Sequence, residues 1–133
     1  MKSKITLLTI CLFTFLTSCV QNSFNDEIQD IANDTNRKLP TMVDNATRLE
    51  NVSVHTGKVY QYNFTLINVE KRNFDSYSFK NNQKSKLVSE IRQMSKKSGF
   101  DFFVDNNVTF SYSYKDNNGD FLLSILVKPS DYK

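Results

Sequence analysis

The hydrophobic residues of this chain follow three different spacings. Residues 5–16 form an apolar stretch that carries no charged side chain. Further along, apolar side chains recur at every third or fourth position, which is typical of a helix with one buried face, or at every second position, which is typical of a strand. The pattern predicts a leading apolar segment followed by alternating helices and strands.

A first helix is expected over residues 23–37. Its apolar side chains stand at i, i+4 and i+7 and can bury only one face: Phe24, Ile28 and Ile31. Ser23 is a suitable N-cap, because its hydroxyl can accept a hydrogen bond from a backbone N–H of the first turn. Pro40 ends the segment, since a proline disfavours helical geometry at the residue before it.

A second helix is expected over residues 80–97, where four apolar residues repeat at helical spacing: Leu87, Val88, Ile91 and Met94. Gly99 suits the left-handed residue that follows a helix C-terminus. Three phenylalanines come directly afterwards and are expected to pack beneath this helix: Phe100, Phe102 and Phe103.

Four segments alternate between apolar and polar residues, namely 48–55, 59–67, 108–114 and 121–127. Turn residues follow the first and the third segment, so the four strands are expected to pair as two hairpins. Both hairpins can join one antiparallel sheet of about four strands. The order helix, hairpin, helix, hairpin then predicts an α+β two-layer sandwich with helices on one face of the sheet.

The alternation also assigns side chains to the two faces of the sheet. One face carries Tyr60, Tyr62, Tyr112 and Tyr114. The other carries Gln61, Asn63, Thr65, Ser111, Ser113 and Ser124. We expect the aromatic face to form the core; the alternative is an outward aromatic surface whose hydroxyls bind a glycan or a protein. The polar set would form the open face, which makes Gln61, Asn63, Ser111 and Ser113 candidate partner-binding residues.

Residues 1–18 have the organisation of an export signal. Lys2 and Lys4 give a basic start, residues 5–16 are apolar, and Thr17 and Ser18 are small. A helix over residues 5–16 would be about 18 Å long, well short of the roughly 30 Å hydrocarbon core, so a permanent spanning helix is disfavoured.

The tetrapeptide Leu16-Thr17-Ser18-Cys19 resembles the lipobox of bacterial lipoproteins. The resemblance implies that Cys19 carries a thioether-linked diacylglycerol, that the signal is cut before Cys19, and that the new amine takes an acyl chain such as palmitate. Several acyl chains anchor a protein far more firmly than one. We therefore expect a signal peptide at 1–18, a lipidated anchor and short tether at 19–22, and one domain at 23–133.

The residue after the lipidated cysteine bears on location. In such lipoproteins an aspartate there retains the protein in the inner membrane, whereas this chain has Val20. The resemblance thus implies the outer membrane, with the domain facing the periplasm. The inner membrane and the membrane of a host with a single membrane stay open as alternatives.

Maturation also changes the charge of the chain. The full sequence has 17 basic and 14 acidic residues, a net charge of +3. Loss of residues 1–18 removes two lysines and leaves 15 basic residues against 14 acidic ones, a net charge of +1. A nearly neutral domain has no excess charge to attract nucleic acid, so we expect no nucleic-acid partner.

Candidate catalytic groups are few. His55 is the one imidazole, and we expect it to be an exposed residue beside a turn; no serine has a Gly-x-Ser-x-Gly context. One histidine cannot build a multi-histidine metal centre. Asp116 and Asp120 lack the ligand spacing of a calcium loop and are expected to bond their own backbone. We expect no enzymatic activity, no metal and no cofactor.

Residues 39–52 are less generic than the rest of the chain. They begin with Leu-Pro and place Asp44 four residues before Arg48. The segment resembles a pattern found in small uncharacterised bacterial lipoproteins, a resemblance that implies no activity. Asp44 and Arg48 are expected to pair and pin the crossing from the first helix to the sheet; the alternative is a fixed loop that presents both to a partner.

Together these features favour a lipid-anchored, non-enzymatic protein that binds another protein of the envelope. Candidates are an accessory or pilotin-like component of a secretion apparatus, or an inhibitor or immunity-type binder. An anchor raises the effective concentration of the domain near its partner. The alternative is a ligand-binding module for peptidoglycan, glycan or lipid.

The lipidation of Cys19 is directly testable. Mass spectrometry of the mature protein should find residue 19 at the N-terminus with acyl chains attached. The variant Cys19→Ser should leave the membrane fraction, because no thiol is present to take the diacylglycerol. A free thiol at Cys19, or a signal still attached to the exported product, would contradict the prediction.

Overall fold

A computed structural model describes residues 19–133, with side chains described from residue 23 onward. The predicted signal peptide at 1–18 lies outside these residues. The elements follow one another as α1 (Cys19–Asn36), β1 (Thr41–Met42), β2 (Thr47–His55), β3 (Val59–Leu66), the short 3₁₀ helix η1 (Lys71–Asn73), α2 (Ser76–Met94), α3 (Asp101–Asp105), β4 (Thr109–Asp116), β5 (Phe121–Val127) and α4 (Pro129–Tyr132). The α+β class and both hairpins agree with the sequence pattern.

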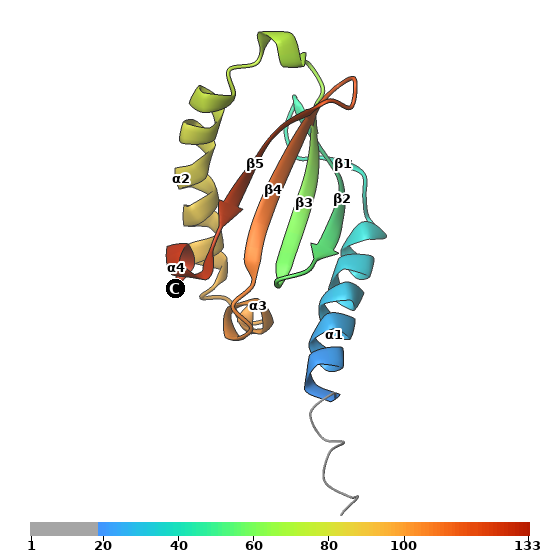
Figure 1. The fold of residues 1–133 in the computed structure, drawn as a ribbon, viewed down its shortest axis with the longest axis vertical. Helices are drawn as coiled ribbons and strands as arrows, with labels where there is room; N and C mark the ends of the chain where they lie inside the picture. The colour runs from blue at the N-terminus through green and yellow to red at the C-terminus, as the bar shows by residue number, and fades with distance from the viewer. Residues whose placement is uncertain (1–18) are drawn as a thin grey trace, which may run out of the picture.

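The sheet differs from the expected one in strand number and direction. It has five strands in the order β1-β2-β3-β4-β5, and β3 pairs with β4 in parallel. The prediction of a purely antiparallel sheet of about four strands was therefore wrong. The reason lies in the connection between the hairpins: α2 carries the chain back along the sheet, so β4 starts from the same end as β3 (Figure 1).

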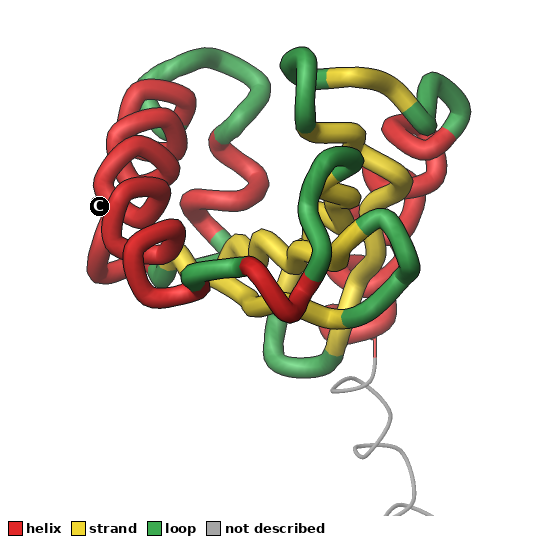
Figure 2. Tube along the Cα trace, turned by 90° about the horizontal axis from the view of Figure 1, so that it is seen from above, coloured by secondary structure: helices red, strands yellow, loops and turns green. Residues whose placement is uncertain are grey.

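All three longer helical segments cover the same face of the sheet. Thr35 of α1 accepts a hydrogen bond from Tyr60, Phe79 of α2 meets the ring of Tyr114, and Phe103 of α3 meets the ring of Tyr60. These contacts all involve the aromatic face of β3 and β4. Figure 2 shows helices flanking the strands on both sides. The expected covering of the aromatic face by helices is thus confirmed.

The core lies between this face and the helices. Residues that are fully enclosed come from every layer: Ile28, Ala32, Ile91, Val108, Phe110, Ile125 and Val127 are at most 1% exposed. Phe110 packs against Phe100, Phe103 and Tyr132 at ring separations of 5.5 to 5.9 Å, within the usual range of aromatic pairs. These contacts lie at the α3 end of the sheet.

The helix bounds differ from the expected ones at both N-termini. α1 begins at Cys19, so residues 19–22, expected as a tether, form its first turn, and Ser23 lies inside the helix instead of capping it. Nothing between Cys19 and Ser23 is a helix breaker. α2 begins at Ser76 instead of 80, because Asp75 is the cap: its carboxylate accepts from the backbone N–H of Ser78 at 3.0 Å.

Gly99 adopts the expected left-handed conformation, but it lies in the turn before α3 and not directly after the end of α2. α2 ends at Met94, three residues earlier than expected, and Gly99 has φ +91° in the turn that leads into α3. A positive φ is easily adopted only by glycine. Phe100 and Phe103 enter the core against Phe110, and Phe102 stacks on Phe24 of α1 at 5.5 Å, so these rings are shown packing on β4 and α1, whereas the prediction placed them beneath α2.

One side chain joins α1 to the edge of the sheet. The amide of Asn36 donates to the carbonyl of Val52 at 2.9 Å and accepts from the N–H of Val52 at 2.7 Å. It thereby satisfies both backbone groups of an edge residue, as a neighbouring strand would. This fixes the end of α1 against β2.

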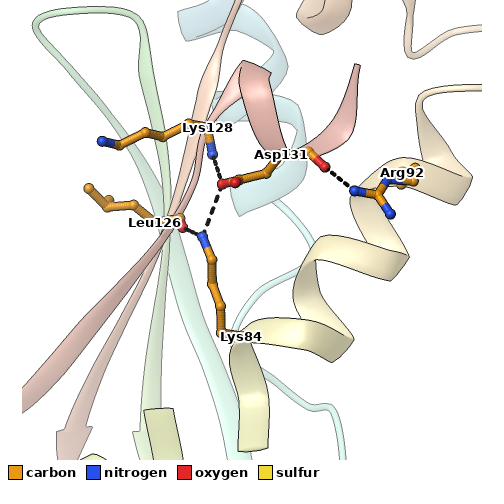
Figure 3. A network of polar contacts seen from close by, with 5 residues as sticks. All are labelled: Lys84, Arg92, Leu126, Lys128 and Asp131. Atoms are coloured by element: carbon orange, nitrogen blue, oxygen red, sulfur yellow. Dashed lines mark hydrogen bonds and ion pairs between the residues drawn. The ribbon is translucent and has the colours of Figure 1, made fainter. Parts of the chain in front are cut away.

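At the opposite edge a lysine joins α2 to β5 and α4. Lys84 donates to the carbonyl of Leu126 and pairs with Asp131 at 3.0 Å (Figure 3). The carboxylate of Asp131 also accepts from the backbone N–H of Lys128, while Arg92 donates to the carbonyl of Asp131. The Lys128 N–H, followed by Lys84, lowers the pKa of Asp131.

A buried aspartate organises the end of the sheet where β3 and β5 meet their loops. Asp116 is 1% exposed, and its carboxylate accepts from the backbone N–H groups of Lys71, Asn118 and Asp120 at 2.8 to 2.9 Å. The expectation that Asp116 bonds its own turn is confirmed. The bond to Lys71, which joins the turn to η1, had no signal in the sequence.

No helix within residues 19–133 is long and apolar enough to cross a membrane.

Asp116 should make stability depend on pH. Its three N–H donors, that of Lys71 first, lower its pKa below the ordinary 3.8, so its contribution is present above about pH 4 and is lost as the pH falls through the folded value. Asp116→Asn should lower the melting temperature at pH 7 by several degrees, because the amide NH₂ faces an N–H donor. The difference from wild type should shrink towards pH 2.

The matched control is Asp120→Asn, an exposed carboxylate of the same turn. Its melting temperature should stay close to that of the wild type from pH 7 to pH 2. A gap between Asp116→Asn and wild type that stays constant from pH 7 to pH 2 would contradict the assignment.

Candidate functional site

The polar face of the sheet carries a connected hydrogen-bond network. Ser111 donates to Gln61 at 3.1 Å, Gln61 donates to Asn63 at 2.8 Å, and Asn63 donates to Asn51 at 2.8 Å and to Ser53 at 3.1 Å. The network crosses from β4 through β3 to β2. The structure therefore brings together three of the predicted site residues, and it also shows that they bond one another.

Arg48 and Ser113 lie on this same face. Asn63 is in register with Ser113 of β4, and Arg48 is opposite Thr65 of β3. Partners in register point to the same side of a sheet, so both share the face of Asn63. The alternation in the sequence correctly predicted this shared face for Ser113.

The expected ion pair between Asp44 and Arg48 is wrong. Arg48 instead pairs with Glu50 at 2.8 Å. The carboxylate of Asp44 accepts from the backbone N–H of Ala46 at 2.7 Å, and this bond lowers the pKa of Asp44. Arg48 and Glu50 are two residues apart in β2 and so lie on the same side of the strand, whereas Asp44 lies in the loop before β2.

The opposite face carries a row of four stacked rings that we call the aromatic ladder: Tyr62, Phe64, Tyr112 and Tyr114. Tyr62 stacks on Tyr112 at 5.3 Å, and Phe64 stacks on Tyr114 at 5.2 Å. The parallel register of β3 and β4 places these residues side by side in pairs. The ladder occupies the half of the face beyond the α3 contacts of Tyr60 and Phe110.

The hydroxyls of the ladder differ from those of the other core tyrosines. Tyr60 donates to Thr35, and Tyr132 donates to the Val108 carbonyl at 2.7 Å. The hydroxyls of Tyr62, Tyr112 and Tyr114 make no hydrogen bond to a residue in the described part of the chain. None of these three oxygens is a fully buried polar atom. Their rings are therefore largely enclosed while their hydroxyls reach the surface.

Burial and nearby carboxylates govern the ionisation of these tyrosines. Desolvation raises the pKa of Tyr62 and of Tyr112 well above the ordinary value of 10. The pKa of Tyr114 is raised to about 12 by burial, and the negative charges of Glu90 and Asp44 add to this. Two exposed carboxylates, one from α2 and one from the loop before β2, therefore face the end of the ladder.

The remaining candidates show no catalytic arrangement. His55 is exposed at the end of β2, as expected, and its Nε2 lies 2.9 Å from the hydroxyl of Ser53. Within residues 23–133, no three histidine, cysteine or acidic side chains are grouped as metal ligands. The lipidation of Cys19 stays a prediction, because its side chain lies outside the described part.

Comparison with solved structures shows that other proteins share this fold. A protein from Pseudomonas aeruginosa described as secreted has a TM-score of 0.65 at 9% identity, with 84% of this chain and 95% of that chain covered. The pilotin EpsS of the Vibrio vulnificus type 2 secretion system has a TM-score of 0.58 at 10% identity, covering 84% of this chain and 94% of that chain.

The type II secretion pilotin AspS of Vibrio cholerae has a TM-score of 0.54 at 11% identity, covering 84% of this chain and 94% of that chain. No protein-family model and no curated protein matches the sequence. At such low identity these likenesses establish a shared fold, which spans almost the whole of each neighbour.

The sequence did not predict the two features that distinguish the aromatic ladder, namely its unpaired hydroxyls and the stacking of its rings across β3 and β4. The alternation of residues 59–67 put Phe64 on the same face as Tyr60 and Tyr62, which was expected to form the core, but it gave no sign that three tyrosine hydroxyls stay unpaired. Pairing across β3 and β4 depends on their parallel register, which the alternation of each strand does not contain. Glu90 also had no signal, since it is one of several charged residues on α2.

The ladder tyrosines should make the protein sensitive to alkali. A raised pKa in the folded state contributes stability that is present below the unfolded value of about 10 and is lost as the pH rises towards about 12. Urea unfolding followed by circular dichroism should show wild type losing stability above about pH 10. The triple variant Tyr62→Phe, Tyr112→Phe, Tyr114→Phe should lose much less.

At pH 7 the free energy of unfolding of the triple variant should be within about 1 kcal/mol of the wild-type value, because the deleted hydroxyls have no partner in the described part of the chain. Tyr60→Phe is the control that should be destabilised at pH 7, since it loses the bond to Thr35. Equal alkaline losses in wild type and in the triple variant would contradict the role of the ladder.

Proposed function

We propose that this chain is a lipid-anchored, non-enzymatic accessory component of an envelope secretion assembly, similar in role to a type II secretion pilotin. The observation that carries the proposal is the fold shared with two such pilotins over 94% of their lengths. The lipobox-like Leu16-Thr17-Ser18-Cys19 supports it independently, because it rests on residues outside the matched fold.

The proposed anchor and the domain are compatible in geometry. α1 begins at Cys19 and runs along the sheet, and its first turn lies at one end of the molecule (Figure 1). An outer-membrane anchor at Cys19 would place that end towards the membrane. The end of β3, on the far side in Figure 1, would then face the periplasm.

We assign partner binding to the aromatic ladder and not to the polar network. Gln61, Asn63 and Ser111 already bond one another, so a protein would have to displace existing hydrogen bonds there. The ladder instead offers unpaired hydroxyls above an apolar floor, the combination that makes tyrosine frequent in binding surfaces. Asp44, a residue predicted for partner binding, belongs to the rim of this surface.

The charge at the rim indicates the chemistry of the partner segment. Asp44 and Glu90 are both exposed, and the negative charge of each raises the pKa of Tyr114. A partner of complementary charge would carry an apolar stretch for Tyr62 and Phe64 with a lysine or arginine at its end. Such a segment from a protein of the assembly is the occupant we propose.

Site-specific crosslinking tests the proposal. A photoreactive phenylalanine analogue at Tyr62, in the lipidated protein, should crosslink in cells to one envelope protein identified as a component of a secretion assembly. The same analogue at Tyr77, an aromatic residue 76% exposed and outside the ladder, is the control and should give no such product. Cys19→Ser should reduce the yield, because the local concentration falls.

The double variant Asp44→Asn, Glu90→Gln should weaken the crosslink about tenfold if the rim pairs with a cation. Identical products from positions 62 and 77, or a product that is not part of a secretion assembly, would contradict the proposed function. Neither carboxylate supports the core, so the fold should be unaffected.

A further inference from the structure

The polar face contains a hollow of about 590 Å³ beside the edge of β5. Strands β3, β4 and β5 form its floor, with Gln61, Ser111 and Ser124, and α2 forms one wall, with Lys80, Asn81 and Lys84. This size is within the range of small-ligand sites. The hollow lies on the other face of the sheet from the aromatic ladder, so it is separate from the proposed partner surface.

The lining alternates between polar and apolar groups. Amides and hydroxyls of Gln61, Ser124 and Asn81 stand beside the aliphatic side chains of Val59 and Leu126, of which Leu126 is 43% exposed. A sugar ring presents hydroxyls at its edge and C–H groups on its faces. The hollow therefore offers both kinds of contact that a saccharide uses.

The charge of the hollow is positive. Lys84 is engaged with Asp131 and the carbonyl of Leu126, whereas Lys80 has no ion pair within residues 23–133. No acidic residue is among the described residues that line the hollow. The ammonium of Lys80 is thus left to pair with an anionic group of a ligand.

We propose that this hollow binds an anionic saccharide, and specifically a carboxylate-bearing amino sugar of the cell-wall glycan. Asn81 and Ser124 hold the hydroxyl edge of the sugar, Leu126 and Val59 contact its apolar face, and Lys80 pairs with its carboxylate. The site would give the anchored domain a second attachment, to the wall as well as to the membrane. It does not depend on which protein occupies the ladder.

Binding of defined sugars to the full mature lipoprotein in detergent tests this proposal. The disaccharide of N-acetylglucosamine and N-acetylmuramic acid, which carries a carboxylate, should bind about tenfold more tightly than chitobiose, which lacks one. Titration calorimetry and NMR shift mapping measure the two affinities. Equal affinities, or no binding of either sugar, would overturn the proposal.

Variants then locate the binding site. Lys80→Gln should remove the preference for the carboxylate, whereas Lys86→Gln, an exposed lysine on α2 outside the hollow, should keep it. Ser124→Phe should block both sugars by filling the floor, with circular dichroism confirming that the fold is kept. Retention of the preference in Lys80→Gln would overturn the assignment.

Inorganic phosphate serves as the third arm of the experiment. It should compete weakly, because it offers charge without hydroxyl and C–H contacts. If phosphate displaces the disaccharide at equal concentration, the hollow is a general anion site and the saccharide assignment fails.

Discussion

The parallel pairing of β3 with β4 is the constraint on which the rest of the structure depends. It sets Tyr62 beside Tyr112 and Phe64 beside Tyr114, so that four rings stack across two strands. Parallel strands require a long crossover, and α2 with α3 supplies it. The crossover in turn covers part of the aromatic face, and on the polar face α2 lines only the hollow beside the edge of β5.

The two faces consequently have different capacities. On the helical side, enclosed rings carry surface hydroxyls, with two carboxylates near Tyr114. On the open side, Gln61, Asn63 and Ser111 are tied into a network, and a hollow lies where that network meets α2. The sheet therefore separates the surface proposed to bind a protein from the hollow proposed to bind a saccharide.

Much of the local structure was predictable because it depends on near neighbours. The alternation in β3 and β4 gave the correct face to Tyr112 and to Ser111, and the helical spacing gave Ile28 and Ile91 to the core. The turn at Asp116 followed from the residue types. The prediction that Asp44 pairs with Arg48 failed, because Asp44 bonds the backbone of Ala46 in the loop before β2 and Arg48 pairs with Glu50, two residues along the same strand.

The amino-acid order by itself determined the α+β class and the two chemical faces of the sheet, since each depends on residues close together in the chain. The export signal and the lipobox resemblance also come from the sequence alone and stay predictions. Only the tertiary structure decided the direction of β4 against β3, the bond from Asp116 to Lys71 and the placing of Lys80 and Ser124 around one hollow. Those features join segments more than 40 residues apart. An alternating strand has the same pattern in either direction, so its partner is chosen by the path of the connecting helix.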